Sequence, residues 1–202
     1  MVLTQLTYRL YSMAIETLAA AVFIIPLFML LQGCYVHKRK RTAYYVVFAL
    51  YLSVVYAETG LPTIKSFHFS PNINLIPFKS IRGESTESIL NVLLFVPLGF
   101  LLPFVWTPFQ KFANTFLFGV GVSFTIEILQ LLTFRATDIN DIITNGVGTI
   151  IGYCFAAVWL KVFPKIHNIG KATDIVLLVA VTVFVMAFPQ PAIVSLILKV
   201  IQ

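Results

Sequence analysis

The sequence predicts an all-α fold, a polytopic bundle of about six transmembrane helices. Of its 202 residues, 59% are hydrophobic and only 11% are charged, and the mean hydropathy is +0.93. Both features lie far from the composition of an ordinary soluble domain. Apolar stretches recur along nearly the whole chain, each of roughly the 20 residues that cross a hydrocarbon layer about 30 Å thick. Helices are the expected form because a backbone in lipid must satisfy its own hydrogen bonds.

Hydropathy divides the chain into successive spans. The first begins near Ala14 and is longer than the roughly 7 to 15 apolar residues of a signal peptide, so it is expected to remain as a membrane helix. Pro189 and Pro191 fall within the last span and predict a kink or interruption near its middle. The predicted helices cover residues 14–36, 42–59, 89–106, 112–133, 142–163 and 174–198.

A basic run between the first two spans, His37 to Arg41, predicts the orientation of the bundle. Lysine and arginine beside membrane ends favour the cytoplasmic side, which leaves both termini and most of the acidic residues outside. The net charge of +6 is therefore interpreted as a topology signal, and no nucleic-acid partner is expected. Cys34 and Cys154 lie far apart, inside or at the edge of spans, where packing is expected of them and a disulfide is not. The scattered histidines lack metal-ligand spacing.

Polar residues gather at the predicted outer end of the fourth span. Glu127 lies about two turns below the surface, where an ionised and unpaired carboxylate is costly. Gln130 shares its helix face, and Arg135 follows within reach of that face. A functional acid is predicted here, and a purely structural hydrogen bond between helices is the alternative.

A second polar stripe begins the fifth helix, with Asp138, Asp141 and Asn145 at helical spacing. We expect it to face Glu127 across a helix pair, with Asn91 at the same level on the third span. Helix capping by Asp138 and Asp141 is the alternative, although it does not account for Asn145.

Small residues predict how the helices pack. Gly148 and Gly152 form a GxxxG pattern that favours close approach of two helices. Gly119 and Gly121 are expected to be helix contacts as well, whereas Pro97 and Gly99 are expected to bend the third helix.

These polar segments resemble the VanZ-like family over about residues 70–155. The blocks that carry the resemblance occur in the family's order and spacing: NLIPF at 74–78, NVLLFVPLG at 91–99, FTIEILQ at 124–130 and ATDINDIITNGVG at 136–148. The resemblance divides the chain into an additional helix and basic turn at 1–41, a family-like core of four transmembrane helices at 42–163, and a C-terminal helix at 164–202.

What the resemblance implies is a multi-pass protein of the bacterial plasma membrane that gives low-level resistance to lipid-tailed glycopeptides such as teicoplanin. The expected partners are membrane lipids and either a lipid-tailed glycopeptide or a lipid-linked cell-wall precursor, and the oligomeric state is left open. The expected ligand-binding residues face outside and comprise Asn74, Asn91, Glu127, Gln130, Arg135, Asp138, Asp141 and Asn145.

Two other function classes stay open at this point. An intramembrane enzyme acting on a lipid-linked wall precursor would use Glu127, Asp138 and Asp141 as acid and base, or to hold a divalent cation, while no other cofactor is expected. A small-molecule transporter would use polar residues within the helices as a substrate path.

Overall fold

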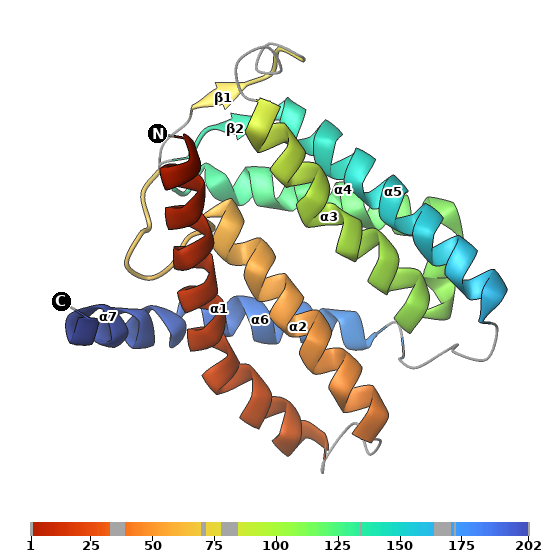
Figure 1. Ribbon diagram of the computed structural model, residues 1–202, viewed down its shortest axis with the longest axis horizontal. Helices are drawn as coiled ribbons and strands as arrows, with labels where there is room; N and C mark the ends of the chain where they lie inside the picture. The colour runs from red at the N-terminus through yellow and green to blue at the C-terminus, as the bar shows by residue number, and fades with distance from the viewer. Residues whose placement is uncertain are drawn as a thin grey trace. The chain divides into compact units, whose positions relative to one another are not determined.

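A computed structural model describes residues 2–32, 39–69, 72–77, 85–133, 135–163, 171 and 173–201 (Figure 1). Within these residues the chain is helical apart from one short strand pair and its connections. The elements are α1 (Val2–Leu31), α2 (Arg39–Thr59), β1 (Ile73–Asn74), α3 (Ser85–Val105), the 3-10 helix η2 (Thr107–Gln110), α4 (Phe112–Gln130), β2 (Thr137–Asp138), α5 (Ile139–Val162), α6 (Asp174–Ala187) and α7 (Gln190–Ile201).

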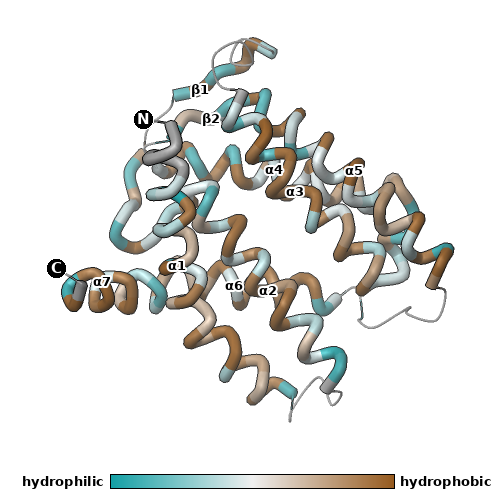
Figure 2. Tube along the Cα trace, in the orientation of Figure 1, coloured by the Kyte–Doolittle hydropathy of each residue, from teal (hydrophilic) through white to brown (hydrophobic). Residues whose placement is uncertain are grey.

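The predicted all-α polytopic bundle is confirmed. In the described part of the chain, five helices are long and apolar enough to cross a membrane, and α6 and α7 together form a sixth candidate that is bent by 41°. The interruption predicted at Pro189 and Pro191 lies at this bend. Figure 2 shows apolar segments along each of the helices.

Several helices begin earlier than hydropathy alone predicts. α1 starts at Val2, α3 at Ser85 and α5 at Ile139, because a helix that leaves the hydrocarbon layer keeps its backbone hydrogen bonds and continues through polar residues. α2 ends at Thr59, and Gly60 follows with a φ of 61°. That left-handed conformation suits a glycine placed just after a helix. Cys34, His37 and Lys38 lie outside the described residues.

The chain divides into two compact units, one made of residues 1–67 and 173–202 and the other of residues 68–172. α1, α2, α6 and α7 belong to the first unit, and α3, α4, α5 and the strand pair belong to the second. The family-like core expected at 42–163 therefore includes residues of both units.

The first unit is joined by polar contacts as well as by an apolar core. Arg9 on α1 forms an ion pair with Glu58 on α2, with 2.6 Å between Nη2 and Oε1. The hydroxyl of Tyr45 on α2 donates a hydrogen bond to the carboxylate of Asp174 at the start of α6, and both residues are buried. At the bend, the backbone N–H of Ile64 donates to the carbonyl of Ala187, a residue of the last turn of α6 (3.1 Å).

In the second unit, glycines allow the backbones of α3 and α5 to touch. A β-carbon on Gly148 or on Gly152 would overlap the carbonyl oxygen of Val92 or of Val96, respectively. The predicted GxxxG contact is therefore confirmed, and its partner is the backbone of α3.

The other small residues correct two predictions. Gly99 is a contact glycine, because a β-carbon there would overlap the carbonyl oxygen of Thr149, whereas the sequence assigned it a bending role. Gly119 packs closely on the side chain of Thr149, as predicted. Gly121 does not form a helix contact within the described part of the chain, since no described atom lies within 4 Å of the place its β-carbon would take. It is two residues from Gly119, and positions so spaced point to different sides of a helix.

Candidate functional site

The site is built around a strand pair that the sequence did not reveal. β1 and β2 run parallel, with Ile73 paired to Thr137 and Asn74 to Asp138. The backbone N–H of Thr137 also donates to the carbonyl of Asn72 (2.9 Å). Because α5 follows β2 directly, the long connection before α3 is tied to the start of α5 (Figure 1).

Asp138 caps α5 and holds the connection in place at the same time. Its Oδ1 accepts hydrogen bonds from the backbone N–H of Asn140 (2.8 Å) and from Nδ2 of Asn140 (2.7 Å). Its Oδ2 accepts a hydrogen bond from Nδ2 of Asn74 at 2.9 Å. The capping alternative is thus correct for Asp138, and the bond from Asn74 adds a role that capping alone does not describe.

Glu127 joins α4 to this strand pair. Its side chain is only 2% exposed, and its Oε2 accepts the backbone N–H of Asp138 at 2.7 Å. The hydroxyl of Thr137 donates to the backbone carbonyl of Glu127 at 2.9 Å. The burial expected of Glu127 is confirmed, but its bond runs from a helix to a strand and not from one helix to another.

These bonds define a polar cluster of Asn74, Glu127, Thr137, Asp138 and Asn140. Three ionisable groups act electrostatically on its central carboxylate, namely Asp138, Asp141 and Arg135. The cluster therefore carries at least two acidic side chains in a part of the protein where an unpaired charge has a high desolvation cost. A nearby arginine offsets part of that cost.

A second polar contact joins α4 and α5 deeper in the bundle. Nδ2 of Asn145 donates to Oγ of Ser123 at 2.9 Å. Asn145 is 2% exposed, and its Oδ1 is buried without a hydrogen-bond partner in the part of the chain that the structure describes. Asn145 thus faces α4, as the predicted stripe requires.

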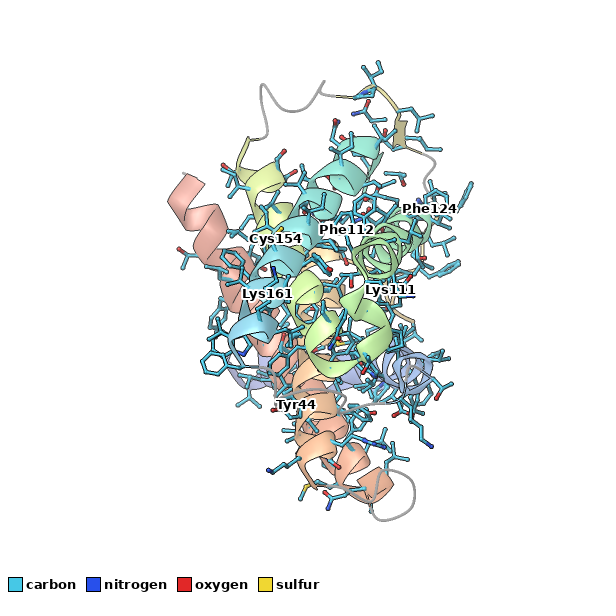
Figure 3. All side chains as sticks on the ribbon, turned by 90° about the vertical axis from the view of Figure 1, so that its right-hand side faces the viewer. Tyr44, Lys111, Phe112, Phe124, Cys154 and Lys161 are labelled. Atoms are coloured by element: carbon cyan, nitrogen blue, oxygen red, sulfur yellow. The ribbon has the colours of Figure 1, made fainter. Side chains whose placement is uncertain are left out.

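The faces of α4 show why these residues point inward. Its buried positions include small or polar residues such as Gly119, Ser123 and Glu127. Large apolar side chains lie on the outside, and Figure 3 shows Phe124 projecting away from the helix. This arrangement suits lipid, because small and polar residues form the contacts between helices while apolar residues face the acyl chains.

The remaining predicted residues lie outside the bonds that define the cluster. Gln130 is buried at the end of α4, and its carbonyl accepts the hydroxyl of Thr133 (2.9 Å). Asn91 on α3, Arg135 and Asp141 are each partly exposed. Their ligand-binding role stays a prediction.

Three members of this polar network were missed from the sequence. Asn140 and Thr137 stood in the quoted family block, but their spacing places them off the stripe of Asp138, Asp141 and Asn145. Ser123 was detectable in principle, because it lies four residues before Glu127 and so shares its helix face.

No three His, Cys, Asp or Glu side chains of the described residues lie close enough together to hold a metal ion. Asp138 instead accepts hydrogen bonds from amide groups on both of its oxygens. The divalent cation at Glu127, Asp138 and Asp141 stays a prediction from the sequence.

Comparison with known proteins identifies the family. The family model described as VanZ/LLP1 matches residues 42–161, a segment that reaches from α2 to α5 and contains the whole polar cluster. Protein VanZ of Enterococcus faecium is 34% identical over 116 residues, which cover 57% of this chain and 70% of that protein. No solved structure matches the chain. Since the family model covers more than half of the sequence and the apolar helices agree with it, the chain is a multi-pass membrane protein that belongs to the VanZ-like family.

Proposed function

We propose that this chain is an envelope protein of the bacterial plasma membrane that gives low-level resistance to lipid-tailed glycopeptides such as teicoplanin. Its polar cluster binds a lipidated or lipid-linked ligand at the outer surface of the plasma membrane. Five further residues contribute to this site, namely Asn91, Gln130, Arg135, Asp141 and Asn145. The observation that carries the proposal is the buried carboxylate of Glu127, bonded to the strand pair where α4 ends and α5 begins.

The position of the cluster along the spans supports this function. α4 ends at Gln130 and α5 starts at Ile139, so the cluster lies where two membrane helices meet the headgroups. The basic run before α2 favours the cytoplasm, and with alternating spans that orientation supports an outside position for this end of α4 and α5. Glycopeptides act on cell-wall precursors on that side of the membrane.

The bonding of the acids favours binding over catalysis. Hydrogen bonds from the amides of Asn74 and Asn140 hold Asp138 in place as the cap of α5, a role in ordering the cluster, whereas a general acid or base has to be directed at a substrate proton. Glu127 receives a backbone N–H and orders β2. Ordered acids and amides beside partly exposed charges, such as Arg135 and Asp141, suit recognition of a polar headgroup.

Expression of the chain in a susceptible bacterium should raise the minimal inhibitory concentration of teicoplanin far more than that of vancomycin, which lacks an acyl tail. The comparison is made against an empty vector, with the abundance of the protein in membranes measured in parallel. Equal protection against both drugs would remove the lipid tail from the proposal, and no protection at normal abundance would remove the resistance role.

A further inference from the structure

The connection that carries β1 exposes large apolar side chains although it lies outside the spans. We define the apolar loop as the described residues 68, 69 and 72–77. The exposed fractions are 64% for Phe69, 51% for Ile73, 67% for Leu75 and 57% for Ile76. A single exposed leucine is ordinary on a protein surface, but a group of this kind in one short segment marks a surface that contacts something apolar.

The backbone of the apolar loop is held in place, so the exposure is not that of a free tail. The N–H of His68 donates to the carbonyl of Leu132 just beyond α4 (2.9 Å). Asn74 bonds Asp138 through its Nδ2 and accepts the N–H of Ile76 through its Oδ1 (3.3 Å). Polar atoms of the loop thus form hydrogen bonds with the bundle, while its apolar side chains stay exposed on the surface.

These anchors also set the level of the loop. Its partners at Leu132, Thr137 and Asp138 all lie in the short stretch between the end of α4 and the start of α5. Both helices are membrane spans by length and composition. The loop is therefore fixed at the height where the spans leave the hydrocarbon layer, and the same two helices expose apolar side chains such as Ile128 and Ile143.

We propose that the apolar loop inserts its exposed side chains into the boundary between headgroups and acyl chains of the leaflet beside it. The occupant of this surface is lipid, because the anchors at Leu132, Thr137 and Asp138 hold the loop at the level where two membrane spans end, and the apolar side chains stay exposed in the described part of the chain. Removal of this apolar surface from water would stabilise such an insertion. One consequence of the insertion rests on the proposed function: a ligand whose lipid tail lies in the leaflet would reach the polar cluster by moving along the membrane.

Nitroxide accessibility in phospholipid nanodiscs tests the insertion. Single cysteines replace Leu75 or Ile76 in a background with Cys34→Ser and Cys154→Ser, and collisions are measured with oxygen, which concentrates in lipid, and with a water-soluble nickel chelate. Asn72→Cys serves as the matched polar position of the same loop, and Val158→Cys on the exposed side of α5 as the lipid reference.

The labels at 75 and 76 should favour oxygen more than the label at 72 does, and less than the label at 158, as expected for the interface. Nickel accessibility at 75 and 76 equal to that at 72 would overturn the insertion. Dipolar broadening between labels would do so as well, since it would show that a second copy covers the loop. The measurement uses no glycopeptide, so its failure is distinguishable from failure of the teicoplanin assay.

Discussion

Replacement of Gly152 by alanine should lower the free energy of unfolding by about 1–3 kcal/mol, the usual cost of overpacking a well-packed site. The added methyl would overlap the carbonyl oxygen of Val96, and a backbone atom cannot rotate away as a flexible side chain does. α3 and α5 must therefore separate. We expect a lower midpoint of thermal unfolding for the purified protein in detergent, and a loss of protection against teicoplanin, because α5 begins at the polar cluster.

Gly121 offers a matched control on a neighbouring helix. Among the residues that the structure describes, nothing lies within 4 Å of the place its β-carbon would take, and alanine is favoured over glycine inside a helix by roughly 0.5–1 kcal/mol. Gly121→Ala should leave the midpoint unchanged or raise it slightly. Similar losses in the two variants would show that the helix contact between α3 and α5 is not the reason for the effect.

Replacement of Glu127 by glutamine should abolish protection against teicoplanin while the protein still reaches the membrane. The amide oxygen of glutamine can accept the N–H of Asp138 as the carboxylate does, so the fold should lose on the order of 1 kcal/mol or less. Glutamine, however, can neither ionise nor release a proton, so the electrostatic interaction of this position with Arg135 and Asp141 is lost. Loss of activity at normal abundance would therefore report the ionisable carboxyl group and not the packing.

The aspartate variant tests the geometry of the same bond. Glu127→Asp keeps an ionisable carboxyl group but retracts it by one methylene from the backbone nitrogen of Asp138, which lies 2.7 Å from Oε2 of Glu127 in the wild-type structure. We expect it to fail too. Asp141→Asn should reduce protection as well, whereas Glu87→Gln, which alters an exposed acid in the first turn of α3, should retain it. Full protection by the Glu127 and Asp141 variants at normal abundance would reduce these acids to packing and capping groups.

The sequence was most informative where the lipid environment dictates the pattern. Apolar length predicted the spans, and the two prolines predicted the break between α6 and α7, because a proline lacks the N–H that a continuous helix requires. The spacing of Gly148 and Gly152 predicted a close helix contact, and the burial of Glu127 followed from its place within a span. Each of these features depends on a local rule.

What the sequence did not reveal depends on contacts between distant segments. β1 and β2 are two residues each, too short for any periodicity, and Asn74 meets Asp138 across 64 residues of chain. Gly99 and Gly121 were misassigned because composition shows that a residue is small but not which face of the helix it occupies. The bond that joins Glu127 to a strand could not be foreseen without the strand.

A direct binding measurement tests the central claim that the polar cluster binds a lipid-tailed ligand at the membrane surface. Fluorescently labelled teicoplanin is titrated into nanodiscs that hold the wild-type chain, the Glu127→Gln variant or no protein. We predict saturable binding to the wild type beyond the partitioning into empty nanodiscs, clearly weaker binding to Glu127→Gln, and little competition by vancomycin. Identical signals from wild-type and empty nanodiscs would contradict the account, because the acyl tail alone would then explain the association.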